Sequence, residues 1–295
     1  MRKRATPGGA GLLPPGLSAE HLGPHDRYFW DDLWGIAGLR AAAHAMASLG
    51  LSEDASRLRE EAAAFLLDVD AALRHAAVRL GRPAMPAAPD RPLDAGMIGN
   101  VAACWPLDLM PADDPRLTDT LAALEARYFL QDAFLHPLVH SGWNPYLTLQ
   151  CAQCYLAAGR ARDAWRLFHR VRALATADGS WPEAIHPRTG GGCMGDGFHG
   201  WAAAEFVLFL RNTVAIERDD TLIVTPIGFE ASLEVERLPT CFGEVDLRIS
   251  VADGRWRLRF QARFREAPIA VRWAAPGGPV DVPMQGGEVD GGAAT

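Results

Sequence analysis

Two adjacent carboxylates stand among aromatic residues in the segment DRYFWDDLWG, residues 26–35. Asp31 and Asp32 directly follow Trp30, although aromatic rings favour burial and carboxylates favour water or a partner. Burial against rings raises the pKa of a carboxyl group, which keeps it able to donate a proton. One interpretation is that one Asp is a general acid while the other binds a polar group or braces Arg27. The alternative is that both acids only complement a helix dipole.

A second set of residues that could take part in a reaction lies on two long loops. One loop contains HSGWNP, and the other contains SWPEAIHPRTGGGCMGDGFHGW with a single Glu, Glu183. Flat rings stack on the C–H faces of a pyranose, whereas carboxylate and guanidinium groups bind its hydroxyls. Hydrolysis of a sugar also needs two acids in different protonation states. We therefore predict a sugar site that involves these loops.

Each of these residues also has an ordinary structural interpretation. Glu183 follows a proline and could be a first-turn acid, and His199 could be an interior histidine. Glu205 is expected to be structural. The glycine run at residues 190–192 lacks the lysine and the flanking strand of a phosphate-binding loop, so it predicts no nucleotide site. The functional interpretation depends on the combination of residues.

The bulk composition excludes several classes of protein. The chain has 295 residues, a net charge of −7 and 49% hydrophobic residues, enough for one large domain or two smaller ones. It has no block of Lys and Arg, which argues against nucleic acid or an anionic membrane as the main partner. The basic residues 2–4 precede Gly and Pro, and no apolar run approaches about eighteen residues. We therefore expect a cytoplasmic protein without a signal peptide or a membrane span.

The five cysteines are sparse and odd in number, so they do not predict a disulfide framework. Cys151 and Cys154 form a lone C-x-x-C, and no second pair follows at the spacing of a zinc site. A redox dithiol would be expected in a βαβ context, which is missing. We expect small core residues on one helix face and no metal.

Helical periodicity extends from residue 30 to about residue 212. Ser52 is a predicted N-cap and Gly81 a predicted helix end. Asp114-Pro115 and Asn144-Pro145 place Pro at a first helical position after a capping residue. About seven helices are predicted, beginning near residues 30, 53, 97, 115, 145, 161 and 200.

After Asp220 the apolar residues recur at every second position, as in a β-strand, instead of at helical spacing. Residues 245–251 alternate, Asp253-Gly254 predicts a two-residue hairpin turn, and residues 256–264 alternate back. The predicted fold is mainly α, with helical hairpins followed by a small antiparallel, sandwich-like β domain. The predicted parts are a flexible segment at residues 1–16, a helical domain at 17–215, a β domain at 216–275 and a disordered tail at 276–295.

Two segments resemble the α/α-barrel glycoside hydrolases. YFWDDLWGIAGLRAA resembles the Trp-Asp segment of the trehalase and processing α-glucosidase families, to which the glucoamylases are related. SWPEAIHPRTGGGCMGDGFHGWAAAEF resembles the late trehalase-type segment, in which Gly200-Trp201 enters the last helix. The resemblance covers about residues 10–215 and implies a barrel of six helical hairpins.

This resemblance implies inverting hydrolysis of an α-glucosidic or similar bond. The Asp after Trp is the general acid in those families, which corresponds to Asp31, and the catalytic base corresponds to Glu183. The substrate is a carbohydrate, and the chemistry needs no metal or organic cofactor. With this resemblance, Trp30, Trp143, Trp181 and Trp201 are expected to shape the sugar subsite, and the candidates for contacts with its hydroxyls are Arg27, Asp32, Asn144 and His199. Seven helices are fewer than six hairpins require, so we expect the C-terminal part of a larger enzyme. A missing N-terminal half or a homo-oligomer partner would complete it.

Three alternatives stay open. Residues 144–175 would also suit a helical-repeat scaffold that binds peptides. Sugar phosphorylases on similar barrels keep the acid and let phosphate replace the base. An incomplete, inactive barrel would expose an apolar flank.

Overall fold

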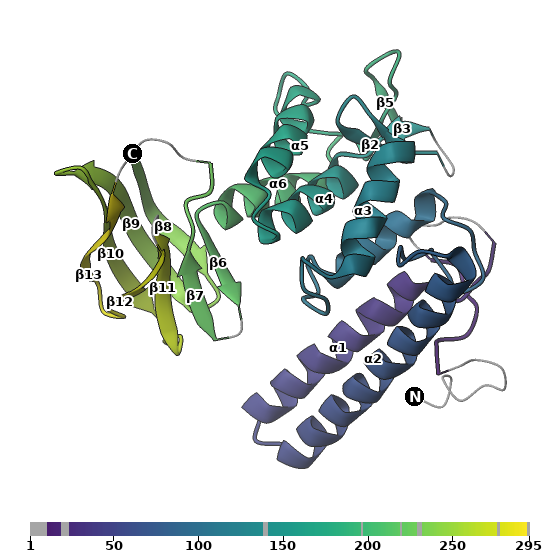
Figure 1. Cartoon of the computed structure of the whole chain (residues 1–295), viewed down its shortest axis with the longest axis horizontal. Helices are drawn as coiled ribbons and strands as arrows, with labels where there is room; N and C mark the ends of the chain where they lie inside the picture. The colour runs from purple at the N-terminus through teal and green to yellow at the C-terminus, as the bar shows by residue number, and fades with distance from the viewer. Residues whose placement is uncertain are drawn as a thin grey trace. The chain divides into compact units, whose positions relative to one another are not determined.

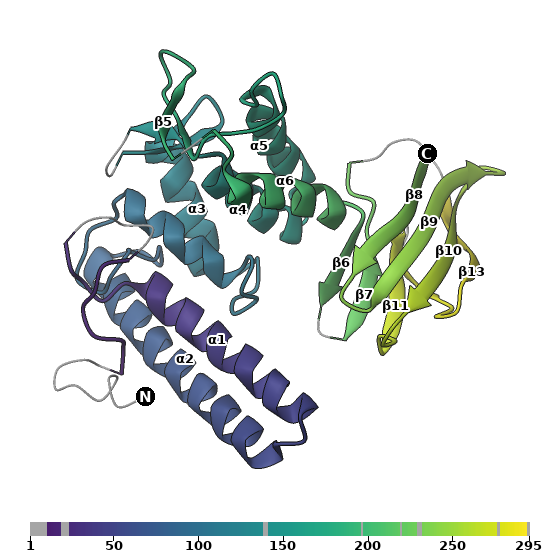
Figure 2. The ribbon, with the colours of Figure 1, turned by 180° about the vertical axis from the view of Figure 1, so that it is seen from behind.

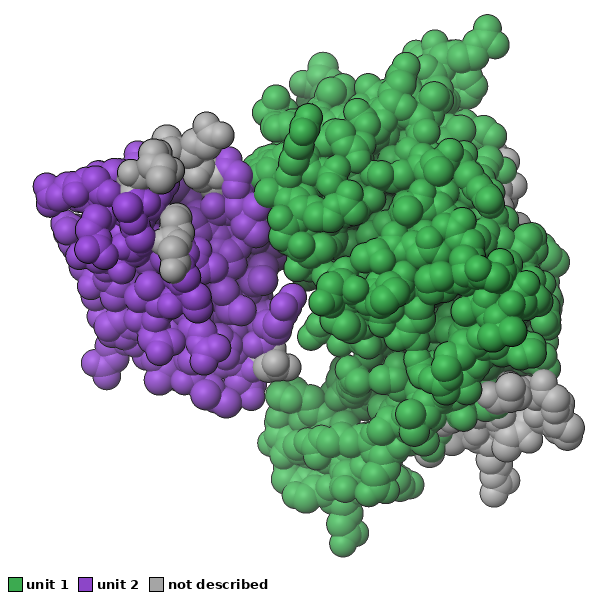
Figure 3. Space-filling view, viewed as in Figure 1, with its two compact units in different colours: residues 1–203 green, residues 204–295 purple. Residues whose placement is uncertain are grey.

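The computed structural model describes residues 11–18, 24–137, 141–195, 197–218, 220–228, 232–275 and 278–293. The chain divides into two compact units, residues 1–203 and 204–295, which are coloured separately in Figure 3. This division lies inside helix α6 (Gly200–Asn212), earlier than the boundary at residue 215 that the sequence suggested. No helix among the described residues is long and apolar enough to cross a membrane.

The described residues contain seven helices, in agreement with the sequence. Besides α6 they are α1 (Phe29–Ser48), α2 (Ser52–Leu80), the 3-10 helix η1 (Ala95–Ala103), α3 (Pro115–Tyr128), α4 (Pro145–Ala157) and α5 (Ala161–Ala173). Figures 1 and 2 show α1 and α2 side by side as a long hairpin. The closure of the hairpins into a barrel stays a prediction.

Local capping chemistry sets several helix ends. The carboxylate of Asp114 accepts the N–H of Arg116 at 2.8 Å, and the side chain of Asn144 accepts the N–H of Leu147 at 2.9 Å. Gly81 ends α2 in the left-handed region at φ 68°. The predicted cap at Ser52 is wrong, because α2 begins at Ser52 and the preceding Leu51 has no side-chain acceptor.

Helices α4 and α5 show how a hairpin of this unit is built. Every residue of α4 from Leu147 to Leu156 is buried, whereas α5 buries one stripe at helical spacing. A helix buried on all sides lies inside a protein, and an amphipathic helix covers it from outside. Cys151 and Cys154 are free, buried thiols of α4, as expected for small core residues.

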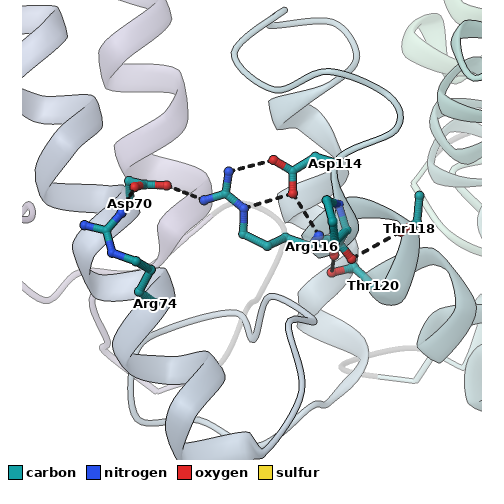
Figure 4. A network of polar contacts seen from close by, with 7 residues as sticks. Asp70, Arg74, Asp114, Arg116, Thr118 and Thr120 are labelled. Carbon is teal, nitrogen blue, oxygen red and sulfur yellow. Dashed lines mark hydrogen bonds and ion pairs between the residues drawn. The ribbon is translucent and has the colours of Figure 1, made fainter.

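An ion-pair network fixes the start of α3 against α2 (Figure 4). The guanidinium of Arg116 contacts the carboxylate of Asp70 on α2 and that of Asp114 at 2.7 Å. Asp70 also pairs with Arg74 one turn along α2. The hydroxyl of Thr120 donates to the carbonyl of Arg116 at 2.7 Å. Two helices distant in sequence are therefore joined through one arginine.

A small antiparallel sheet gathers the long loops of the helical unit. Its strands lie in the order β1-β2-β3-β4-β5. They are β1 (Phe129–Leu130), β2 (Ala133–His136), β3 (Gly142–Trp143), β4 (Ala184–Ile185) and β5 (Gly192–Met194). The sequence did not predict this sheet, because strands this short contain too few residues for an alternating pattern.

Residues 11–16 were predicted to be flexible, but part of this segment is tied to the helical unit. Leu12 is buried, and the N–H of Leu13 donates to the Asp32 carboxylate at 2.8 Å. Gly16 pairs with Asp26 through two backbone hydrogen bonds. Two adjacent leucines give this Gly- and Pro-rich segment an apolar anchor. Residues 1–10 lie outside the described residues.

The second unit is a sandwich of two four-stranded sheets, with orders β13-β10-β9-β8 and β12-β11-β7-β6 (Figure 1). Its strands are β6 (Ala215–Arg218), β7 (Thr221–Val224), β8 (Leu233–Thr240), β9 (Gly243–Ala252), β10 (Arg255–Phe264), β11 (Ala270–Ala275), β12 (Gly278–Val282) and β13 (Gly287–Ala293). Asp253-Gly254 joins β9 to β10 as predicted. The strands pair antiparallel, as expected, except that β7 and β11 pair in parallel.

The predicted disordered tail, residues 276–295, instead contains β12 and β13. Strand β13 pairs with β10, so Val289 lies opposite Leu258. Gly291 packs on the fully buried ring of Trp273, since a Cβ at Gly291 would lie 2.8 Å from that ring. The glycine-rich composition suggested disorder, but Gly291 is a glycine because the Trp273 ring leaves no room for a side chain there.

Candidate active site

Asp31 and Asp32 lie in the first turn of α1 but in different environments. Asp32 is 0% exposed, and its Oδ1 accepts the N–H of Leu13 at 2.8 Å. Asp31 is half-buried. Consecutive side chains on a helix point about 100° apart, so neighbouring acids can have separate functions. Asp32 tethers the segment before the helix, and this tether takes up one oxygen of the carboxylate that was predicted to bind sugar.

Burial raises the pKa of the Asp31 carboxyl above its ordinary value, and a hydrogen bond with Ser18 lowers it in part. The positive end of a helix dipole favours a carboxylate at this position, so burial opposes the dipole. The Asp31 carboxyl therefore keeps its proton to a higher pH than an ordinary aspartate does. This is the property that a general acid requires.

Aromatic rings lie beside Asp31 on the same helix. The rings of Trp30 and Trp34 are 5.7 Å apart between centroids, and Trp34 is 38% exposed. Arg27 is half-buried just before the helix, and its backbone N–H donates to Asp26 at 2.8 Å. The start of α1 thus combines an acid, a cation and partly open aromatic surface.

Glu183 lies on the connection between α5 and β4 and is half-buried. Its side chain packs against the backbone of Gly195, which follows β5. The β4–β5 pairing of Ala184 with Met194 brings these two positions together. The loop acid is therefore held by a hairpin.

Trp143 and Trp181 are each 5% exposed, which leaves little of either ring open for stacking on a sugar. The indole N–H of Trp143 donates to the carbonyl of Leu130, and that of Trp181 donates to the carbonyl of Val171, each at 2.9 Å. The guanidinium of Arg170 also lies 4.3 Å from the ring centroid of Trp143. Both tryptophans anchor loops to the helical unit.

Asn144 is also structural, because it is 3% exposed and its side chain caps α4. A side chain that satisfies a helix N-terminus from a buried position has little capacity left for a hydroxyl ligand.

Tyr146, His199 and Trp201 form an aromatic cluster at the starts of α4 and α6. The ring of Tyr146 lies 6.2 Å from that of His199 and 5.5 Å from that of Trp201. Trp201 is 57% exposed, and the backbone N–H of His199 donates to the carbonyl of Trp181 at 2.8 Å. The cluster offers open aromatic surface on the loop that carries Glu183. The sequence pointed to His199 and Trp201 but not to Tyr146, whose signal was its position directly after the Asn144-Pro145 helix start.

The predicted residues therefore fall into two groups. Arg27, Trp30, Asp31 and Asp32 belong to the start of α1, whereas Trp181, Glu183, His199 and Trp201 belong to the loops around β4 and β5. Figure 1 shows α1 running away from the end of the helical unit at which β2, β3 and β5 lie. The two acids, Asp31 and Glu183, are 152 residues apart in sequence.

The described residues contain no group of three or more His, Cys, Asp or Glu arranged to hold a metal ion. A groove of about 620 Å³ lies in the β unit, on β8, β9 and β10. Charged side chains such as Arg237, Glu244 and Asp246 line it, and none of its lining residues is aromatic. This groove does not match the aromatic sugar site that the sequence predicted.

Comparison with known proteins gives a fold but no family. No protein-family model matches this chain, and no curated protein matches it. A structure of a glycosidase variant with a Glu-to-Ala substitution matches with a TM-score of 0.51 at 17% identity, covering 66% of this chain and 54% of that one. The wild-type glycosidase gives a TM-score of 0.48 at 18% identity, with coverages of 62% and 51%.

A bacterial glucoamylase complexed with acarbose gives a TM-score of 0.49 at 16% identity, covering 63% of this chain and 33% of that one. The chain spans about half the length of the glycosidase structures it matches. At this identity the first similarity shows a shared fold alone.

Proposed function

We propose that the helical unit is a glycoside hydrolase-type domain that cleaves an α-glucosidic or similar bond, with Asp31 as general acid and Glu183 as general base. The observation that carries the proposal is the half-buried Asp31 carboxyl with its raised pKa, beside Trp30 and Trp34. The chain also shares a fold with a glycosidase over 66% of its length. Asp32 keeps a structural function, which explains why two acids are adjacent.

In the proposed reaction, Asp31 donates its proton to the glycosidic oxygen as the bond from that oxygen to the anomeric carbon breaks. Glu183 takes a proton from a water molecule, and this water attacks the anomeric carbon from the opposite face. Asp31 ends ionised and Glu183 ends protonated, and exchange with solvent restores both. This arrangement requires about 6.5–9.5 Å between the two carboxyl groups, whereas about 5–5.5 Å would favour a retaining reaction.

Exposed rings support the carbohydrate part of the proposal. Trp34 is 38% exposed and Trp201 is 57% exposed, each within one of the two groups that contain a proposed catalytic acid. Such rings can stack on the apolar face of a pyranose. In this proposal they replace the buried Trp143 and Trp181 as the surface that orients the sugar.

The two acids can be distinguished by the leaving group of the substrate. Maltose, isomaltose and trehalose need protonation of the departing oxygen, whereas α-glucosyl fluoride needs little. We expect Asp31→Asn to lose about 10²–10⁴-fold on the disaccharides but to keep most activity on the fluoride. Glu183→Gln should lose activity on both kinds of substrate, because water activation is needed in each. Glu53→Gln, an exposed acid in the first turn of α2, is the matched control.

Product analysis separates the remaining possibilities. Proton NMR of the first-formed sugar should show the β-anomer if hydrolysis inverts an α-linkage. Turnover that depends on added phosphate would indicate a sugar phosphorylase. Full activity of either acid variant on the disaccharides would remove that residue from the mechanism. Absence of turnover on every substrate, together with peptide binding, would favour the scaffold interpretation.

A further inference from the structure

The backbone of Gly195 approaches the side chain of Glu183 more closely than another residue type would permit. A Cβ placed on Gly195 would lie 2.8 Å from the Cβ of Glu183 and 3.1 Å from its Oε2. The first of these atoms is the rigid base of the glutamate side chain, so a rotamer change alone could not relieve the contact. Either the 183 backbone or the 195 backbone would have to move.

Glycines make close contacts on both sides of Glu183 as well. A Cβ on Gly192 would lie 3.0 Å from the Cβ of Pro182, and one on Gly142 would lie 2.9 Å from the Cβ of Ala184. Residues 182, 183 and 184 are therefore each contacted by a glycine backbone. Close contacts on three consecutive residues limit where Glu183 can lie.

We infer that Gly195 is a positioning residue for Glu183, which fixes the place of the carboxylate by bringing bare backbone against it. The inference rests on the proposed function, in which Glu183 activates water. A misplacement of about 1 Å in a catalytic group can cost about 10²-fold in rate. A methyl group at position 195 should displace Glu183 by a distance of this order.

The hairpin provides a matched control for backbone strain. Gly195 has φ +68° and Gly190 has φ +69°, so alanine at either position adopts the same unfavourable left-handed conformation. A Cβ on Gly190 would meet nothing within 4 Å. Gly195→Ala and Gly190→Ala therefore share the strain, and Gly195→Ala alone adds contact with Glu183.

The experiment compares kcat and KM of the full chain and its variants on α-glucosyl fluoride, together with Tm. We expect Gly195→Ala to lower kcat by about 10–100-fold with little change in KM. Gly190→Ala should keep kcat within about twofold. Backbone strain should lower the Tm of both variants by a similar amount, and the contact with Glu183 should lower the Tm of Gly195→Ala further. Equal kcat values in the two variants would overturn the inference.

Glu183→Gln separates this inference from the proposed function. Full activity of Glu183→Gln would reject Glu183 as the base, whatever Gly195→Ala does. An inactive Glu183→Gln with equal kcat in the two alanine variants would reject the positioning by Gly195 alone.

A stability measurement tests the contact without any need for activity. Gly195→Ala should lower Tm less in a Glu183→Gly background, where neither contacted side-chain atom exists, than in the natural chain. Gly190→Ala should lower Tm equally in both backgrounds. An equal effect of Gly195→Ala in the two backgrounds would show that the contact has no influence and would overturn the inference, even if one variant folds too poorly for kinetics.

Discussion

At the scale of single residues, burial decides which of two chemically identical side chains can do chemistry. Asp32 is 0% exposed and holds the N–H of Leu13, whereas Asp31 is half-buried and has a raised pKa. The same criterion separates the tryptophans, because Trp181 is 5% exposed and Trp201 is 57% exposed. Residue type suggested the chemistry, and exposure separates the side chains that solvent can reach from those held in the core.

The raised pKa of Asp31 predicts a pH-dependent effect on stability. The folded chain holds this proton more tightly than the unfolded chain, so stability falls as pH rises from the unfolded pKa of Asp31 through its raised folded pKa. Asp31→Asn removes this loss. We expect the Tm of Asp31→Asn relative to the natural chain to be higher at pH 7 than at about pH 3. Melting curves across this range, with Glu53→Gln as the control, check the prediction. A Tm difference independent of pH would contradict it.

At the scale of elements, the start of α3 shows how one arginine joins two helices. Asp114 caps α3 and also pairs with Arg116, which reaches Asp70 on α2 (Figure 4). Hydrogen bonds from the Arg116 side chain hold the pKa of Asp114 below its usual range. The ionised Asp114 carboxylate therefore both caps α3 and holds Arg116, the residue that reaches Asp70 on α2.

Substitution Asp114→Ala should destabilise the chain by about 1–2 kcal/mol, mainly through loss of the cap. Because the folded pKa of Asp114 is lowered, its contribution is present above the unfolded pKa and is lost as pH falls through the folded pKa. Urea unfolding at pH 7 and at about pH 3 should show a smaller effect of the substitution at the lower pH. Asp113→Ala, next in sequence and exposed, is the matched control. Equal losses for the two variants at pH 7 would contradict a capping function.

At the scale of the whole molecule, the two units have separate cores. Apolar residues recur at helical spacing in the first unit and at every second position in the strands of the second. The helical unit surrounds the buried α4, and the β unit packs two sheets on residues such as Trp273, Phe260 and Leu258. The last strand completes one of these sheets, although its sequence is rich in glycine. The C-terminal segment is therefore part of the β core.

Gly291→Ala should destabilise the β unit by about 1–3 kcal/mol, because the new methyl group would overlap the ring of Trp273. In a Trp273→Leu background, Gly291→Ala should destabilise the β unit less, since the smaller side chain leaves room for the methyl group. A double-mutant cycle measures this difference. Urea unfolding followed by far-UV circular dichroism measures both effects. A neutral Gly291→Ala would show that β13 does not pack tightly on Trp273.

Much of the fold could be predicted because its signals are local. Pro after Asp114 and Asn144 marked two helix starts, Gly81 marked a helix end, and Asp253-Gly254 marked the β9–β10 turn. Each signal acts through backbone geometry within a few residues. The sheet β1–β5 could not be predicted, because its strands are too short to show an alternating pattern and because β3 and β4 pair only after two distant loops meet.

The sequence by itself determined the helices and the β-hairpin, since these depend on local spacing and residue type. The choice of Asp31 and Glu183 as candidate acids came from the resemblance of two segments to the α/α-barrel glycoside hydrolases. Tertiary structure decided which side chains are exposed, because burial depends on contacts between distant segments. It brought the Asp32 carboxylate to the N–H of Leu13, the Arg170 guanidinium over the ring of Trp143, and the Gly195 backbone against Glu183. No spacing along the chain specifies those contacts, since each joins elements that meet only in the folded protein.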